Sequence, residues 1–94
     1  MREYEVVFIV HADLEETATS EIVERVKSWI TEAGGTVLKV DPWGKRKLAY
    51  PIRKQNEGQY YLIKTQMDPS FVIEMERNLR LLEPVLRFLI TSDN

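Results

Sequence analysis

The sequence contains no cysteine and only one histidine, His11. Without cysteine the chain has no disulfide, no thiolate nucleophile and no zinc knuckle. A Ser-His-Asp triad or a multi-histidine metal site would have to be built on His11 alone, and we interpret this residue as part of a loop without a chemical role. Paired-carboxylate chemistry stays open with 15 acidic residues, but acids are common on any surface. The composition therefore disfavours an enzyme, and we expect no catalytic residue, no metal and no cofactor.

We also expect no membrane-spanning helix and no leader segment. No run approaches the roughly 18 apolar residues of a membrane-spanning helix, and a strand-like pattern begins directly after Met1, which leaves no room for a signal or transit peptide. The 94 residues, 44% of them hydrophobic and 30% charged, fit one modest core. We expect one cytoplasmic domain over residues 1–94, with a short polar tail at 91–94 and with no membrane and no small-molecule substrate among its partners.

Alternating apolar residues predict four strands, and apolar residues at helical spacing predict two helices. The strands span 3–10, 36–54, 59–67 and 85–90, with a turn at 55–58. The first helix spans 15–33, with Asp13 and Glu16 spaced as a capping box; the second begins at Asp68-Pro69 and ends at Pro84. The order β-α-β-β-α-β predicts an α+β, ferredoxin-like fold, in which two helices cover one face of a four-stranded antiparallel sheet.

One segment of this acidic chain is strongly basic. Residues 39–54 carry six basic side chains and one acid, a local charge of +5, whereas the rest of the chain carries −7. Such asymmetry indicates a local anion-binding surface, and nucleic acid is the anion that this charge density favours. An edge strand kept charged to prevent aggregation is the alternative, and Pro51 independently requires an edge position. The candidate phosphate-binding residues are Lys45, Arg46, Lys47, Arg53 and Lys54.

Alternation places Lys45, Lys47 and Arg53 on one side of this strand and Arg46 and Lys54 on the other. A bulge at 41–44 would twist the edge and let both sets reach one nucleic-acid backbone. We expect the apolar members of the strand to anchor it to the sheet. These are Leu48, Tyr50 and Ile52. Trp43, in the bulge, either stacks or covers the core edge, and the sequence leaves both possibilities open.

The sheet face without helices can be deduced from the same alternation. RNA-recognition modules stack bases on aromatic residues of the central strands at this face. On this face the central strands offer Tyr60 but no aromatic residue from the first strand, so base stacking is weakly supported. An exposed aliphatic patch is better suited to a protein partner. The predicted protein-contact residues are Val7, Ile9, Tyr60, Leu62, Lys64, Val85, Arg87 and Leu89, with Lys64 and Arg87 at the polar rim.

The segment Gly44 to Ile52 has the pattern Gly-x-basic-x-Leu-Ala-Tyr-x-Ile. With the opening Met1 to Glu5, the pair Glu57-Gly58 and the stretch from Leu79 to Ile90, it resembles the bacterial-type small-subunit ribosomal protein six family. The resemblance implies a structural protein of the small ribosomal subunit that binds the central domain of small-subunit ribosomal RNA jointly with small-subunit ribosomal protein eighteen. It also implies that the open sheet face contacts protein. Carried over by position, the residues facing RNA are Arg2, Lys45, Arg46, Lys47 and Arg53.

Two other classes compete with this interpretation. An acylphosphatase-like hydrolase on the same fold would need a glycine-rich anion loop after the first strand, where His11-Ala12-Asp13 stands instead. A small ligand-binding regulatory domain that dimerises through its open sheet would also explain an exposed apolar face. The basic segment and the family pattern favour the ribosomal interpretation. The chain also ends at Asn94, without the extended tail that many members of that family carry.

Overall fold

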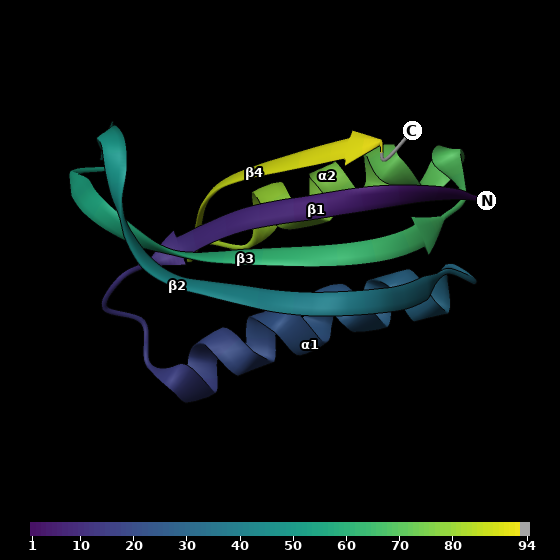
Figure 1. Ribbon diagram of the computed structural model, residues 1–94, viewed down its shortest axis with the longest axis horizontal. Coiled ribbons are helices and arrows are strands. Elements are labelled where there is room, and N and C mark those ends of the chain that lie inside the picture. Colours follow the sequence, from purple (N-terminus) through teal and green to yellow (C-terminus); the bar gives the residue numbers. More distant parts are fainter. Residues whose placement is uncertain (93–94) are drawn as a thin grey trace.

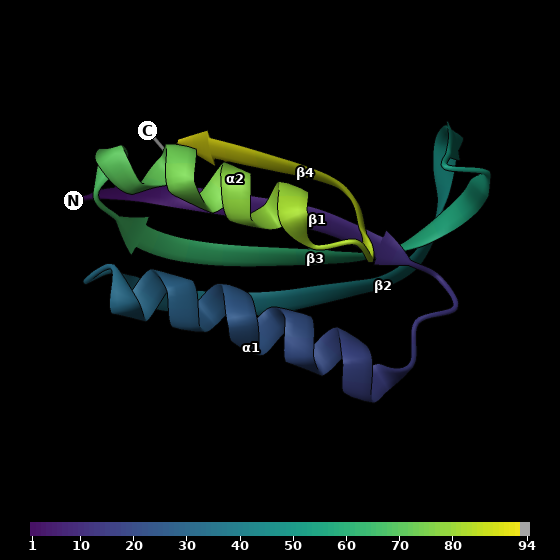
Figure 2. The same ribbon diagram turned by 180° about the vertical axis from the view of Figure 1, so that it is seen from behind.

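The computed structural model describes residues 1–92, which form one antiparallel sheet and two helices. The strands are β1 (Arg2–His11), β2 (Thr36–Ile52), β3 (Gln55–Met67) and β4 (Val85–Ser92), and the helices are α1 (Glu16–Glu32) and α2 (Val72–Leu81). Their order in the sheet is β2-β3-β1-β4. Both helices lie on one face, behind the sheet in Figure 1 and in front of it in Figure 2. The predicted ferredoxin-like fold is confirmed, with β1 and β3 in the centre.

The main core fills the space between the sheet and the two helices. Alternate residues of β1 and β3 face it, as the pattern predicted, and α1 and α2 cover them with aliphatic side chains. Burying each such side chain contributes about 1.5–3 kcal/mol by transfer estimates, so this core positions the sheet. Its fully buried members include Val6, Phe8, Val10, Val26, Ile30, Ile63, Met75 and Leu79.

The two helices begin differently from each other. The chain turns after β1, where the Leu14 N–H donates to the His11 carbonyl oxygen. That turn places Asp13 before the helix, and α1 begins after Glu15 without a side-chain cap, so the predicted capping box is wrong. The Asp68 cap is confirmed: its carboxylate accepts from the Ser70 N–H at 3.0 Å and opens the 3-10 turn η1 (Pro69–Phe71) that leads into α2.

The turn between β2 and β3 lies earlier than predicted. Arg53 and Lys54 form it, with φ of 49° and 65°, and Ile52 pairs with Gln55 across it. Gly58, taken from the sequence as part of the turn, lies inside β3 instead. A Cβ at this position would lie 2.3 Å from Ile9 Cγ2, so the glycine permits close approach of β1 and is not needed to reverse the chain.

The register of β4 corrects one predicted contact residue. A shift between Ile9 and Val10 pairs Val85 with Val10, and Val85 is 4% exposed in the main core. Its predicted position on the helix-free face is therefore wrong. Leu86, the residue displaced by the shift, packs on the helix-free side with Ile9. β4 also continues through Ser92, so the predicted polar tail begins inside a strand, and residues 93–94 lie outside the described residues.

Candidate nucleic-acid and protein interface

The β2–β3 hairpin extends beyond the rest of the sheet and curves over its helix-free face (Figure 1). β1 pairs with β3 only as far as Gly58, so residues 45–58 form a largely two-stranded extension, which we call the basic arm. Register shifts interrupt β2 between Pro42 and Gly44 and after Lys47. Such irregularities bend a strand and increase its twist, and they explain why the arm leaves the plane of the sheet.

A second, smaller apolar cluster attaches the arm to the sheet. Leu48 of the arm is buried against Ile9 and Leu86, with Ile52 and Tyr60 packed beside them. The predicted anchoring role is thus confirmed for Leu48 and Ile52. Tyr50 is not buried with them, since it is 55% exposed, and it contacts the sheet through Arg87 instead.

Two arginines link the arm to β4, at the opposite edge of the sheet, and to the loop that precedes it. Arg87 of β4 donates a hydrogen bond to the Tyr50 hydroxyl, and its guanidinium carbon lies 5.7 Å from the centre of the Tyr50 ring. Arg53, at the tip of the arm, donates from Nη1 to the Glu83 carbonyl oxygen at 2.9 Å. The arm is therefore held over the sheet from both its middle and its tip.

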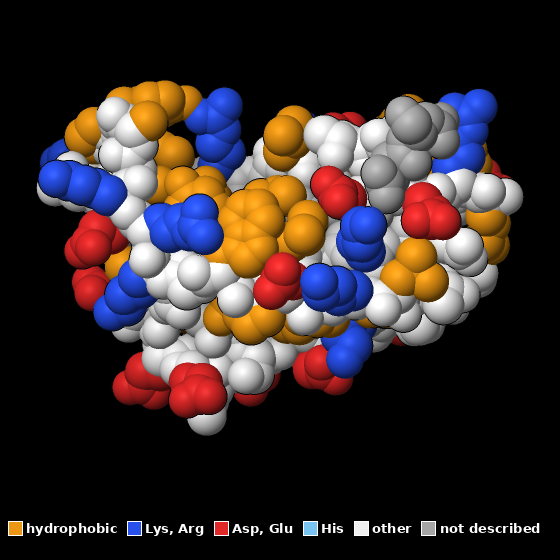
Figure 3. Space-filling view, in the orientation of Figure 1, with side chains coloured by type: hydrophobic (Ala, Val, Ile, Leu, Met, Phe, Trp, Pro, Cys, Tyr) orange, Lys and Arg blue, Asp and Glu red, His pale blue; other side chains and the backbone are white. Residues whose placement is uncertain are grey.

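A groove of about 300 Å³ lies between the arm and β4. Five of the eight predicted protein-contact residues line it: Val7, Ile9, Tyr60, Arg87 and Leu89. Figure 3 shows the apolar surface of this face, with basic side chains around it.

Two further predicted contact residues lie outside the groove. Leu62 pairs with Val7 on the same face, and the Lys64 ammonium lies 3.9 Å from a Glu5 carboxylate oxygen. Ala49 and Tyr50 also line the groove but were not predicted, because the curvature of the arm is not visible in strand alternation.

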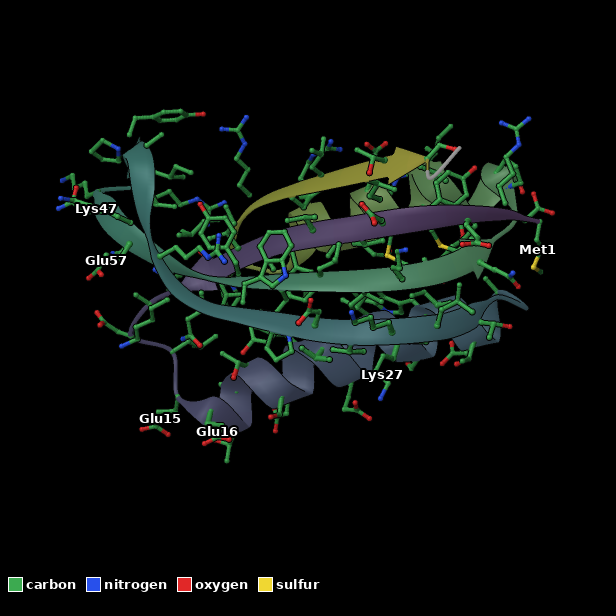
Figure 4. All side chains as sticks on the ribbon, in the orientation of Figure 1. Met1, Glu15, Glu16, Lys27, Lys47 and Glu57 are labelled. Atoms are coloured by element: carbon green, nitrogen blue, oxygen red, sulfur yellow. The ribbon has the colours of Figure 1, made fainter. Side chains whose placement is uncertain are left out.

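The structure gathers five of the six predicted RNA-binding residues on the arm. Figure 4 labels Lys47 there, beside its cross-strand neighbour Glu57. Lys45, Arg46 and Lys47 are all exposed. Arg2 lies at the opposite end of the sheet, near the N-terminus marked in Figure 1, so it does not belong to the same surface.

Trp43 lies at the base of the arm. Its side chain is partly exposed and packs against a neighbouring aromatic ring. Its ring stacks on Tyr60 with centroids 6.4 Å apart and planes 17° apart. Its indole N–H donates to an Asp41 carboxylate oxygen at 3.2 Å, and the Arg46 guanidinium carbon lies 5.1 Å from its ring centre. Trp43 therefore packs on Tyr60 at the edge of the second apolar cluster, and no contact in the structure tests whether it also stacks on a nucleic-acid base.

Neither a metal site nor a membrane-spanning helix is found in the described part of the chain. Among residues 1–92, no group of three or more His, Asp or Glu side chains is arranged to hold a metal ion. Within the same residues, no helix is both long and apolar enough to cross a bilayer. The arm and its adjoining groove are therefore the candidate binding surfaces of the described residues.

Comparison with known proteins gives a consistent result. The profile of the family "Ribosomal protein S6" matches residues 3–92. Small ribosomal subunit protein bS6 of Moorella thermoacetica is 46% identical over 91 residues, which cover 97% of this chain and 93% of the relative. The bS6 of Streptomyces griseus is 48% identical over 87 residues, or 93% and 91% of the two chains. The crystal structure of 30S ribosomal protein S6 from Thermotoga maritima matches with a TM-score of 0.91 and 36% identity, covering 97% and 86%.

Proposed function

Because this chain belongs to the ribosomal protein S6 family, and is therefore a structural constituent of the small ribosomal subunit and not an enzyme, we propose that its basic arm binds small-subunit ribosomal RNA. We propose further that small-subunit ribosomal protein eighteen, a small basic partner, binds its helix-free sheet face. The family and the non-enzymatic role predicted from the sequence are confirmed by the same matches.

The observation that carries the RNA proposal is the concentration of positive charge on one projecting hairpin. Lys45, Arg46 and Lys47 are exposed next to one another, and Arg53 and Lys54 form the tip. Lysine and arginine neutralise phosphates and release counterions, which supplies affinity without reading sequence. The rest of the chain is acidic, so RNA would approach this molecule from the arm.

The groove supports the proposal of a protein partner. Leu89 is 60% exposed, and aliphatic side chains from β1 and β3 continue the apolar surface beneath the arm. Glu3 and Glu5 lie on the same face farther along β1, where Glu3 is exposed and the Glu5 carboxylate lies 3.9 Å from the Lys64 ammonium. An apolar patch next to carboxylates is complementary to a basic protein, which would also add cations to the RNA-binding surface.

Quantitative RNA binding tests the role of the arm. A transcript of the central domain of small-subunit ribosomal RNA is titrated with the protein, the partner, and both together at several salt concentrations. We expect the pair to bind more tightly than either protein alone. Replacing Lys45 and Lys47 by alanine should reduce the magnitude of the log-affinity versus log-salt slope by about two, because two phosphate contacts are lost.

Lys27 provides a matched control, since it is a lysine of α1, away from the arm (Figure 4), and already pairs with Glu24 at 3.0 Å. Lys27→Ala should leave the slope unchanged. An unaffected slope in the Lys45 and Lys47 variant would mean that the arm is charged only to protect a sheet edge. A stable homodimer that uses this face and binds no RNA would instead favour the regulatory-domain alternative.

A further inference from the structure

Arg46 differs from the other basic residues of the arm because an aromatic ring supports it. Its guanidinium lies over Trp43, and Trp43 is itself fixed by the stack on Tyr60 and by the hydrogen bond to Asp41. Gly44, with a φ of 80°, stands between Trp43 and the arm at the bulge. The bulge thus brings residues 43 and 46 of one strand to the same side of the sheet.

We propose that Trp43 is a positioning residue that holds the Arg46 guanidinium ready for an RNA phosphate, so that Arg46 contributes more to RNA affinity than either neighbouring lysine. This inference rests on the RNA-binding function proposed above. It assigns Trp43 a role in RNA binding through Arg46, without contact between the indole and RNA.

The geometry leaves the hydrogen-bond donors of Arg46 available. A guanidinium stacked on a ring uses its face, while its five N–H donors lie in its plane and match the oxygens of a phosphate. Within the part of the chain that the structure describes, the Arg46 guanidinium has no hydrogen-bond or ion-pair partner. Arg53, in contrast, already donates to the Glu83 carbonyl oxygen.

Support by the ring matters because ordering a long side chain opposes binding. A lysine or arginine loses rotamer freedom when it contacts a phosphate, and the loss is smaller for a side chain that is already held. Lys45 and Lys47 are exposed, and within residues 1–92 neither side chain makes a hydrogen bond, an ion pair or a ring contact. Arg46 should therefore contribute more to RNA affinity than Lys45 or Lys47, although each of the three carries one positive charge.

Three substitutions separate positioning from charge. Arg46→Lys keeps the charge and loses the planar group that stacks; Trp43→Leu removes the ring; Trp43→Phe keeps a smaller ring. With the protein–partner pair and the same ribosomal RNA transcript, we expect Arg46→Lys and Trp43→Leu to weaken binding about three- to tenfold. Trp43→Phe should lose less. The salt slope should stay unchanged in all three, because the number of neutralised phosphates is the same.

The double variant Trp43→Leu with Arg46→Lys gives the sharpest result. If the ring acts through Arg46, the double variant binds no more weakly than the weaker single variant, since both changes remove the same support. Additive losses would show that Trp43 acts independently of Arg46 and would overturn the inference. Melting curves establish that each variant folds, and Arg46→Lys with Trp43→Phe keeps the test valid if Trp43→Leu does not.

The controls also separate this inference from the proposed function. If the unchanged pair fails to bind the transcript, the proposed function itself is wrong. If the unchanged pair binds and Trp43→Leu binds equally well, Trp43 only covers the edge of the second apolar cluster. Lys47→Arg serves as the matched arm variant, and it should change affinity less than Arg46→Lys because Lys47 makes no cation–π contact with a ring of the described residues.

Discussion

Gly58 of β3 and Ile9 of β1 approach so closely that a Cβ on residue 58 would lie 2.3 Å from Ile9 Cγ2. The same Cβ would lie 3.2 Å from the Val10 carbonyl oxygen, so it has little room to move away. Gly58 also pairs with His11 on one side and with Arg46 on the other, at the point where the four-stranded sheet becomes the two-stranded arm. This contact therefore sets how the arm leaves the sheet.

Gly58→Ala should destabilise the protein by about 1–3 kcal/mol, the usual cost of overpacking a well-filled site. The φ of Gly58 is not positive, so the effect would come from the contact with Ile9 and not from backbone strain. Urea denaturation measures the change, with Asn56→Ala, an exposed position on the same strand, as the control. Equal stability of the two variants would show that Ile9 can move aside without cost.

The sequence contains enough information for the fold but not for the arm. Alternation in 3–10 and 59–67 and the apolar spacing of the helices depend only on local burial, so they predicted the order and the layers correctly. Asn56 and Gly58 are typical turn residues, yet Gly58 is required by a contact with a strand more than 40 positions away in the sequence. That requirement becomes visible only when the two strands are paired.

The candidate site shows the same limit. Val85 was placed on the wrong face because the register shift opposite Ile9 and Val10 changes the alternation of β4. The stack of Trp43 on Tyr60 could not be predicted either, since it depends on how β2 and β3 align across a bulge. The clustering of positive charge, by contrast, was predicted correctly, because five basic residues that are close together in the sequence stay close on one hairpin.

At the tip of the arm, two basic residues occupy a turn conformation that is unfavourable for side chains, so charge and stability oppose each other there. A two-residue turn with positive φ at both positions favours Asn-Gly, yet Arg53 and Lys54 occupy it. Lys54→Gly should stabilise the protein by up to about 1 kcal/mol, since a left-handed conformation is unfavourable for a residue with a Cβ. It should also weaken RNA binding and reduce the salt slope by about one.

Thermal melting and the RNA titration described above measure both effects of Lys54→Gly. Lys39→Gly, at a position of β2 whose φ is not positive, is a control with the same loss of charge, and it should not stabilise the fold. If Lys54→Gly gains stability without losing RNA affinity, Lys54 does not contact phosphate.

The Asp68 cap of η1, the 3-10 turn that leads into α2, predicts a pH dependence of the folding stability. Hydrogen bonds from the Ser70 backbone N–H and from its hydroxyl lower the pKa of Asp68. A carboxyl whose pKa is lower in the folded state stabilises the fold above its unfolded pKa, and this contribution is lost as pH falls through the folded pKa. Asp68→Asn should therefore reduce stability at neutral pH.

The destabilisation by Asp68→Asn should become smaller as the pH falls below about 4, where the unfolded carboxyl is protonated, and approach a minimum below the folded pKa. Urea denaturation of both proteins at several pH values measures this. Asp13→Asn is the control, because Asp13 lies outside α1 and makes no cap. If the difference in folding stability between Asp68→Asn and the unchanged protein does not vary with pH, the charge of Asp68 does not stabilise the turn.

Leu89 gives the most direct test of the groove as a protein interface. It lines the groove, it is 60% exposed, and it points away from the helices, so its replacement should leave the fold nearly intact. Leu89→Asn should weaken binding of the basic partner by about 1–2 kcal/mol, roughly five- to thirtyfold, as expected when an apolar contact near an interface centre is lost. Asparagine is preferable to aspartate, because an added negative charge would attract a basic partner and hide the loss.

Leu81→Asn is the matched control for Leu89→Asn. Leu81 is 78% exposed at the end of α2, on the opposite layer of the molecule, so the same chemical change there should not affect partner binding. Isothermal titration calorimetry with the purified partner measures the affinity of each variant, and a melting curve confirms that each is folded. Equal affinities for the two variants would place the partner elsewhere than in the groove. A loss of folding in Leu89→Asn alone would mean that β4 depends on this side chain, and Val7→Thr, on the neighbouring strand of the same groove, would then test the interface in its place.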